Sequence, residues 1–132
     1  MNPSRALSWL IGFFITALSA AAAEVPRLTP AEAAQRVAAG EAILIDVREP
    51  SEWADTGVAG PAELLPMSDF NGDRAQWSPF LKKHAGKPLI VYCRSGTRSG
   101  KVAAALKAEG VDVSNSGAFK DWQAAGLPVR KP

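Results

Sequence analysis

The sequence predicts an α/β fold with a central, mostly parallel sheet and helices on both of its faces. Two short apolar runs, residues 42–47 (AILIDV) and 89–92 (LIVY), have the length and the Ile and Val content of buried strands. Helical segments alternate with these runs, and the helix expected at residues 99–109 places Val, Ala and Leu on one face. A chain of 132 residues suits one such domain and leaves little room for a second.

Boundary signals place the elements of the first half of the chain. Residues 29–32 (TPAE) form a capping box with proline at the first helical position, and Gly40 ends that helix. After the first apolar strand, residues 50–55 (PSEWAD) are typical of a short helical turn. A loop rich in Gly and Pro follows at residues 57–61, and residues 63–66 are expected to form a brief strand.

The elements of the second half are placed in the same way. A helix is expected within residues 73–84, where Pro79 limits how the helix starts or bends. The second apolar strand leads into the helix at residues 99–109, which ends at a glycine. Residues 111–114 are expected to form a last strand, and residues 118–125 are expected to form a final short helix that also ends at a glycine.

The first segment of the chain, residues 1–23, is predicted to be a secretory signal peptide. Arg5 is its only charged side chain, residues 9–18 (WLIGFFITAL) form a short uncharged core, and residues 19–23 (SAAAA) supply the small residues of a cleavage site. Cleavage there leaves a domain of residues 24–132 and implies a periplasmic location. The alternative is an uncleaved membrane anchor, because the uncharged stretch approaches the ~20 residues of a spanning helix.

Composition and charge exclude several classes of partner. Hydrophobic residues make up 47% of the chain and charged residues 21%, which is typical of a globular domain and not of a disordered one. The formal net charge is only +2, so no nucleic-acid partner is expected, and no membrane contact is expected once the signal segment is removed. No cluster of His, Cys, Asp and Glu indicates a metal site, and no motif indicates a cofactor.

Cys93 is the only cysteine, and it directly follows the second apolar strand. In an oxidising compartment, an unpaired cysteine is an intermolecular link, an inert buried thiol or a reactive thiol. The residues that lead from it into the next helix are Arg94, Ser95, Gly96, Thr97, Arg98 and Ser99. Backbone N–H groups at a helix N-terminus stabilise an anion, and neighbouring arginines lower a thiol pKa. The context therefore predicts that Cys93 is an activated thiolate nucleophile.

Three kinds of loop chemistry compete for this strand–loop–helix segment. A nucleotide-binding P-loop is excluded, because three residues instead of four separate Gly96 from Gly100, and Val102 occupies the place of the magnesium-binding hydroxyl. Cysteine phosphatases resemble this loop, but their arginine lies one position further from the cysteine than Arg98 lies from Cys93. A shorter loop is expected to bind a group smaller than a phosphoryl. In the third chemistry, sulfur transfer, the loop needs to hold only a terminal sulfur atom.

Three motifs in order along the chain resemble those of the rhodanese-like family. The loop CRSGTRS at residues 93–99 resembles the active-site loop of single-domain rhodaneses. Residues 46–53 (DVREPSEW) resemble the first-strand motif, and residues 117–129 (GAFKDWQAAGLPV) resemble the closing helix motif. The motifs and the signal segment together are similar to the small periplasmic thiosulfate sulfurtransferases. One departure is that residues 57–62 (GVAGPA) lack the histidine of the Gly-His-Ile-Pro-Gly-Ala stretch that the family often has.

The resemblance implies a rhodanese-type thiosulfate sulfurtransferase that works in two steps. The Cys93 thiolate would attack the outer sulfur of a small anionic donor such as thiosulfate, and sulfite would leave from a Cys93 persulfide. An acceptor, cyanide or a thiol, would then remove that sulfur. Two alternatives stay open: a persulfide carrier that serves a partner protein, and a phosphatase-like or arsenate-reductase-like enzyme.

The remaining candidate residues have supporting roles in this interpretation. The loop amides from Arg94 to Ser99 are expected to hold the persulfide, and the arginines of the loop are candidates to orient the sulfonate of the donor. We favour Arg98, which lies nearer the closing end of the loop. Asp46 and Arg48 are expected to be structural, and Arg48 is expected to pair with a nearby carboxylate such as that of Glu52.

Overall fold

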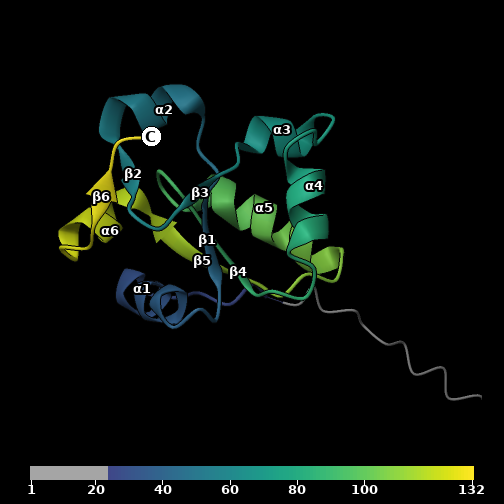
Figure 1. Ribbon diagram of the computed structural model, residues 1–132, viewed down its shortest axis with the longest axis horizontal. Helices are drawn as coiled ribbons and strands as arrows, with labels where there is room; N and C mark the ends of the chain where they lie inside the picture. Colours follow the sequence, from purple (N-terminus) through teal and green to yellow (C-terminus); the bar gives the residue numbers. More distant parts are fainter. Residues whose placement is uncertain (1–23) are drawn as a thin grey trace, which may run out of the picture.

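The computed structural model describes residues 24–132, so the predicted signal segment lies outside the described residues. The elements are α1 (Pro30–Ala38), β1 (Ile43–Asp46), α2 (Pro50–Thr56), β2 (Val58–Ala59), β3 (Glu63–Leu64), α3 (Met67–Asn71), α4 (Trp77–Lys83), β4 (Leu89–Cys93), α5 (Thr97–Ala108), β5 (Val113–Ala118), α6 (Phe119–Ala124) and β6 (Val129–Arg130). Four of the strands form one sheet in the order β3-β1-β4-β5, and β2 pairs separately with β6 (Figure 1).

All neighbouring strands of the larger sheet are parallel, so their carboxyl ends meet at one edge. β4 is an interior strand that pairs with β1 on one side and β5 on the other, and all five of its residues are buried. Cys93 is the last residue of β4. The cysteine therefore stands at the edge where parallel α/β sheets usually carry their functional groups.

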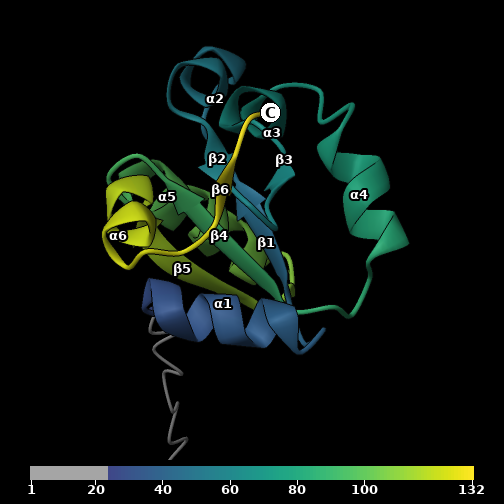
Figure 2. The same ribbon diagram turned by 60° about the vertical axis from the view of Figure 1, so that its left-hand side comes forward.

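The sheet separates two hydrophobic clusters, because successive side chains of a strand point to opposite faces. The helices α3, α4 and α5 lie over one face, and α1 and α6 lie over the other (Figures 1 and 2). On β4, Val91 and Cys93 belong to the cluster under α5, whereas Ile90 and Tyr92 belong to the cluster under α1 and α6. The predicted parallel sheet with helices on both faces is confirmed.

The helix expected within residues 73–84 is present as α4, which begins only at Trp77. The Asp69 carboxylate accepts hydrogen bonds from the backbone N–H groups of Gln76 and Trp77 at 3.0 and 2.9 Å. It thereby provides acceptors for N–H groups at the start of α4 that have no partner within the helix. Asp69 lies on α3, a five-residue helix that the sequence did not predict. The two short helices are therefore joined by a side chain from one to the backbone of the other.

The strand boundaries also differ from the expected ones. Residues 57–61, expected to be a loop, contain β2, which pairs antiparallel with β6 near the end of the chain. The strand expected at residues 63–66 is only two residues long as β3. β5 continues to Ala118 instead of stopping at residue 114, and it leads directly into α6. Among residues 24–132, no helix is long and apolar enough to cross a membrane.

Candidate active site

The loop after Cys93 turns back tightly over the end of the sheet. Gly96 is the N-cap of α5 and has a left-handed φ of +92°. A Cβ at this position would lie 3.3 Å from the Cα of Gly117 on β5. Glycine alone adopts this backbone conformation without strain and permits the close approach, so the loop closes against the neighbouring strand.

The Cys93 thiol is buried, and two hydrogen-bond donors converge on its sulfur. The Gly96 N–H group lies 3.0 Å from Sγ, and the Ser99 hydroxyl oxygen lies 3.3 Å from Sγ. Burial acts to raise the pKa of the thiol, but hydrogen bonds from the Ser99 hydroxyl and from the backbone N–H groups of Ser99, Ser95 and Gly96 outweigh it. The pKa of Cys93 is therefore lowered, and the site favours a thiolate.

The two arginines of the loop have different surroundings. Both guanidinium nitrogens at the end of Arg98 bind the carboxylate of Glu52, at 2.7 and 2.6 Å. The hydrogen bond from Arg98 lowers the pKa of Glu52 to about 2, and the same contact raises the pKa of Arg98. Arg94 is exposed and lines a cavity. The structure thus places Arg94 in the cavity wall, whereas Arg98, which we favoured for orienting the donor, is held by α2.

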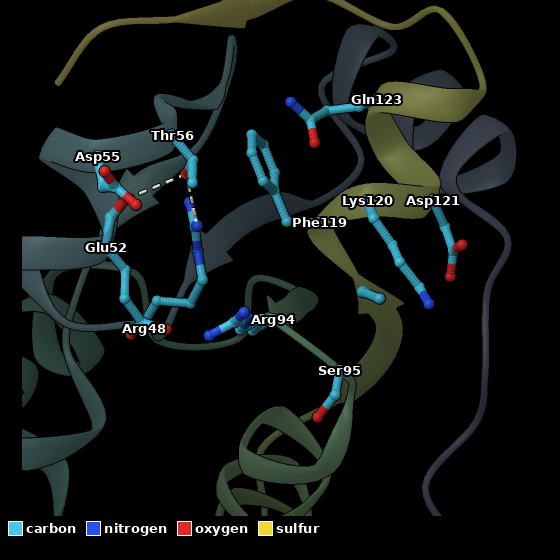
Figure 3. Close-up of a pocket in the computed structure, with 11 residues that line it drawn as sticks. Arg48, Glu52, Asp55, Thr56, Arg94, Ser95, Phe119, Lys120, Asp121 and Gln123 are labelled. Carbon is cyan, nitrogen blue, oxygen red and sulfur yellow. Dashed lines mark hydrogen bonds between the residues drawn. The ribbon is translucent and has the colours of Figure 1, made fainter.

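The cavity beside the loop has a volume of about 790 Å³ and is bounded by three parts of the chain. Figure 3 shows Glu52 and Thr56 of α2 on one side, Lys120 and Asp121 of α6 on the other, and Arg94 and Ser95 of the loop between them. Cys93 is not in the lining, but its chain neighbours Arg94 and Ser95 are, and so is Ala118, its partner across the sheet. The cavity is therefore lined by the neighbours of the cysteine, whereas the buried thiol itself is not part of its wall.

Asp46 and Arg48 form a buried ion pair at the end of β1, with side chains that are 0% and 2% exposed. The guanidinium donates to both carboxylate oxygens of Asp46, and its remaining donors reach the Thr56 hydroxyl and the Gly57 carbonyl, both at 2.8 Å. Arg48 thus pairs with a nearby carboxylate as expected, but its partner is Asp46 and not Glu52, which binds Arg98. Arg48 also lies 4.3 Å above the Phe119 ring and so lines the cavity.

The loop residues Thr97 and Ser99 end up in different places. Thr97 is exposed at the start of α5, and its hydroxyl lies 3.4 Å from that of Ser95. Ser99 is buried and points to the sulfur. The sequence reasoning missed Lys120 and Asp121, which α6 brings to the cavity. It also missed Asn115, a buried polar residue on β5 that contacts Ser99.

Fold and site together define the class of this protein. It is an α/β domain in which a central parallel strand delivers a cysteine to an anion-stabilising loop at a helix N-terminus. The family description "Rhodanese-like domain" matches residues 29–125. The chain therefore belongs to the rhodanese-like domain family.

Curated relatives support the same family. The thiosulfate sulfurtransferase GlpE of Actinobacillus succinogenes is 32% identical over 104 residues, which cover 77% of this chain and 87% of that protein. An uncharacterized protein of Synechocystis is 35% identical over 91 residues, or 67% of this chain. The chain spans 47% of the Synechocystis relative and 22% of a probable adenylyltransferase/sulfurtransferase MoeZ of Mycobacterium tuberculosis.

The fold is also found in solved structures. A rhodanese-related protein from Thermoplasma volcanium superposes with a TM-score of 0.68 at 23% sequence identity, and the match covers 81% of this chain and 99% of that one. At this level of identity the likeness concerns the fold alone, and it agrees with the architecture described above.

Proposed function

We propose that this protein is a sulfurtransferase that carries sulfur on Cys93. The observation that supports this most directly is the thiol itself, whose sulfur accepts the Gly96 N–H group at 3.0 Å and lies 3.3 Å from the Ser99 hydroxyl. This cradle of donors stabilises the Cys93 thiolate, which is the nucleophile that sulfur transfer requires. The names of GlpE and MoeZ, a thiosulfate sulfurtransferase and a probable adenylyltransferase/sulfurtransferase, point in the same direction.

In the first step, we propose that the Cys93 thiolate attacks the outer sulfur of thiosulfate or a similar donor. A new S–S bond forms to Cys93, the S–S bond of the donor breaks, and sulfite leaves with the bonding electron pair. Arg94 and Lys120 supply cationic groups to the cavity wall, where they attract and orient the sulfonate. Arg98 contributes less to donor binding, because Glu52 already neutralises its charge.

In the second step, an external nucleophile attacks the outer sulfur of the persulfide. The Cys93–sulfur bond breaks and its electron pair returns to Cys93 as a thiolate, while cyanide becomes thiocyanate or a thiolate becomes a persulfide. The cavity of about 790 Å³ is within the range of sites that hold drug-sized ligands and is much larger than cyanide requires. Its size favours a thiol as the acceptor.

Mass spectrometry of the purified protein tests the proposal. Incubation with thiosulfate should add about 32 Da, the mass of one sulfur atom, and cyanide should then remove it with release of thiocyanate. Cys93→Ser should abolish the mass increase, and Cys93→Ala serves as a second variant with circular dichroism to check folding. If the wild-type protein gains no sulfur and instead hydrolyses an aryl phosphate, the phosphatase-like alternative replaces this proposal. A stable adduct that leaves only in the presence of a protein thiol would identify a carrier.

We also propose that the protein is exported to the periplasm. The support is the sequence of residues 1–23, with one basic residue, an apolar core and an alanine-rich end. Cell fractionation of a C-terminally tagged chain should find it in the periplasmic fraction, and the intact mass should show that it begins at residue 23 or 24. A full-length chain in the membrane fraction would show an uncleaved anchor instead.

A further inference from the structure

Asn115 on β5 is the polar residue that links the parts of the sulfur-binding loop. It is 4% exposed, and its side-chain amide makes three hydrogen bonds. The Nδ2 group donates to the Gly96 carbonyl at 3.1 Å. The Oδ1 atom accepts from the Ser99 hydroxyl at 2.8 Å and from the Gly117 N–H group at 2.9 Å. One buried amide thus joins the loop, the first turn of α5 and the end of β5.

Both residues that Asn115 holds in α5 and its loop also contact the sulfur. Gly96 donates its N–H group to Cys93 Sγ, while its carbonyl accepts from Asn115. The Ser99 oxygen lies 3.3 Å from Sγ and 2.8 Å from Asn115 Oδ1. Asn115 does not itself reach the sulfur within this network. Its influence on the thiol therefore passes through these two donors.

The Ser99 hydroxyl has one proton and two neighbouring acceptors, so it donates to one of them at a time. When Cys93 is a thiol, its S–H group donates to the Ser99 oxygen and the hydroxyl donates to Asn115 Oδ1. When Cys93 is a thiolate, the hydroxyl proton turns to Sγ, and Oδ1 keeps its bond from the Gly117 N–H group. The sulfur and Asn115 Oδ1 therefore share one hydroxyl proton, and its turn to Sγ removes one of the two hydrogen bonds that Oδ1 accepts.

A bulge in β5 directly follows Asn115. Val91 pairs with Asn115 and Tyr92 pairs with Gly117, so Ser116 is an extra residue in the strand. Bulges of this kind occur next to active sites and redirect a side chain. The Gly117 φ of +83° completes the local turn. Asn115 itself keeps the regular register opposite Val91, so its side chain lies on the side of α5.

We propose that Asn115 is a positioning residue that holds Gly96 and Ser99 in the arrangement that stabilises the Cys93 thiolate and persulfide. The inference deepens the proposed function and rests on it for the persulfide. The statement about the thiolate concerns the unloaded protein, so it is testable without any sulfur donor. A loss of the Asn115 amide frees the Ser99 side chain and leaves the Gly96 carbonyl with only its hydrogen bond from the Gly100 N–H group, so the donors around the sulfur are held less firmly.

The charged groups around this network come from several elements. Arg94 follows the cysteine in the loop, Arg98 on α5 is paired with Glu52, and Arg27 lies next to the loop on the segment before α1. The neighbouring strand β1 contributes a buried ion pair that faces the opposite side of the sheet. Arginines remain charged throughout the range in which a thiol titrates, so a shifted alkylation profile of Cys93 reports on the thiol.

The test measures the rate of Cys93 alkylation by iodoacetamide as a function of pH in the full-length protein. Asn115→Leu should raise the thiol pKa and slow alkylation about fivefold at a pH well below the pKa. At high pH, where the thiol of each protein is ionised, the variant should react at the wild-type rate. Ser114→Ala is the matched control, because Ser114 is a buried polar residue on the same strand that faces the other side of the sheet.

A double variant separates positioning from a general loss of structure. Ser99→Ala should also raise the thiol pKa, and Asn115→Leu should have a smaller effect in the Ser99→Ala background than in the wild type. Asn115→Asp is the second variant should Asn115→Leu fail to fold. It keeps the acceptor oxygens, loses the donor to Gly96 and adds a negative charge, so it should raise the thiol pKa still further.

Two outcomes would overturn the proposal. An unchanged thiol pKa in a folded Asn115→Leu protein would show that Gly96 and Ser99 hold their places unaided. A lowered pKa would show that Asn115 merely competes with the sulfur for the Ser99 proton. Neither outcome depends on sulfur transfer. If alkylation behaves as expected while thiosulfate leaves no persulfide, the proposed function fails and the positioning role of Asn115 stands.

Discussion

At the level of single residues, Cys93 shows burial and hydrogen bonding acting against each other. Burial in the cluster under α5 favours the neutral thiol, whereas donors from Gly96 and Ser99 favour the thiolate, and the donors prevail. This balance requires that each donor be aimed at the sulfur before any substrate arrives. A site arranged in advance in this way stabilises charge without reorganising during the reaction.

Substitution of each arginine of the loop is expected to have a different effect on donor binding and on stability. Under the proposed function, Arg94→Ala should raise the KM for thiosulfate about tenfold, because a cationic donor is lost from the cavity wall. Arg98→Ala should change KM less and should lower the free energy of unfolding by about 1 kcal/mol, because Glu52 loses its partner. Steady-state kinetics and urea denaturation of both variants provide the measurements. A larger KM effect in Arg98→Ala would return the donor-binding role to Arg98.

The Glu52–Arg98 ion pair predicts a specific dependence of stability on pH. The pKa of Glu52 is about 2 in the folded protein, against 4.5 for a free carboxyl, so the pair stabilises the fold above pH 4.5. That contribution is lost as the pH falls through the folded pKa. Because both side chains are a quarter to a third exposed, we expect it to be about 1 kcal/mol.

Urea denaturation of the wild type and Glu52→Gln between pH 7 and pH 2 checks this prediction. The difference in free energy of unfolding should be constant at neutral pH and should shrink toward pH 2. A difference that stays the same down to pH 2 would show that Glu52 acts through something other than its charge. Glu32→Gln is a control, because Glu32 is an exposed capping-box carboxylate that is not paired with an arginine.

Sequence reasoning found the residues of the site that are contiguous and missed those that are not. Cys93 and its loop are contiguous in the sequence, so neighbouring residues were enough to predict their chemistry. The partner of Arg98 is 46 residues away, and nothing local distinguishes it from Arg94. Asn115 forms hydrogen bonds with residues 16 and 19 positions earlier in the sequence, which no local pattern indicates. The available signal was the asparagine itself, because asparagine is uncommon within strands.

At the level of elements, Gly96, the left-handed glycine that joins β4 to α5, is expected to affect both the stability of the fold and the pKa of Cys93. Gly96→Ala should destabilise the protein by about 1–2 kcal/mol, because alanine is strained at a φ of +92°. It should also raise the thiol pKa, because a Cβ 3.3 Å from the Gly117 Cα displaces the loop from the sulfur. Thermal unfolding and the pH profile of alkylation measure the two effects.

Gly110 supplies the comparison, since it ends the same helix with a φ of +87° and has open space around its Cβ position. Gly110→Ala should carry a similar backbone strain and leave the thiol pKa unchanged. Equal pKa values in Gly96→Ala and the wild type would contradict the role assigned to the loop.

Elements with a periodic or capped sequence were predicted, and elements defined by distant partners were not. The capping box of α1 and the apolar strands β1 and β4 carry their own signals. α3 has only five residues, and β2 and β6 have two each, which is too short for any periodicity to register. The start of α4 depends on a hydrogen bond to Asp69 of α3. Because no sequence pattern indicated α3, the first residue of α4 could not be predicted either.

At the level of the whole molecule, the C-terminal segment packs against α6 and the stretch between β2 and β3 through four hydrogen bonds. The Pro128 carbonyl accepts from the Gly60 N–H group at 2.7 Å and from the Trp122 indole at 2.8 Å. Arg130 donates to the carbonyls of Gly60 and Ala62 at 2.9 and 2.8 Å. These bonds tie α6, which carries one wall of the cavity, to the segment between β2 and β3.

Deletion of residues 128–132 is therefore expected to lower the free energy of unfolding by about 3 kcal/mol or more, because it removes these four hydrogen bonds and the pairing of β6 with β2. Deletion of residues 131–132 keeps these bonds and should cost little. Urea denaturation of both shortened chains provides the measurement. Similar stability in the two would show that the last strand is dispensable.

Cys93 is the only cysteine in the chain, so no second thiol of the same molecule can attack the sulfur it carries. Proteins with a resolving cysteine discharge internally as a disulfide, and this chain lacks that route. Under the proposed function, each sulfur atom leaves only on collision with an outside nucleophile. The fraction of loaded protein then rises when such nucleophiles are scarce and falls when they are plentiful. With a single buried thiol, the fraction of persulfide on the protein would therefore depend on the concentration of thiols and other nucleophiles in its compartment.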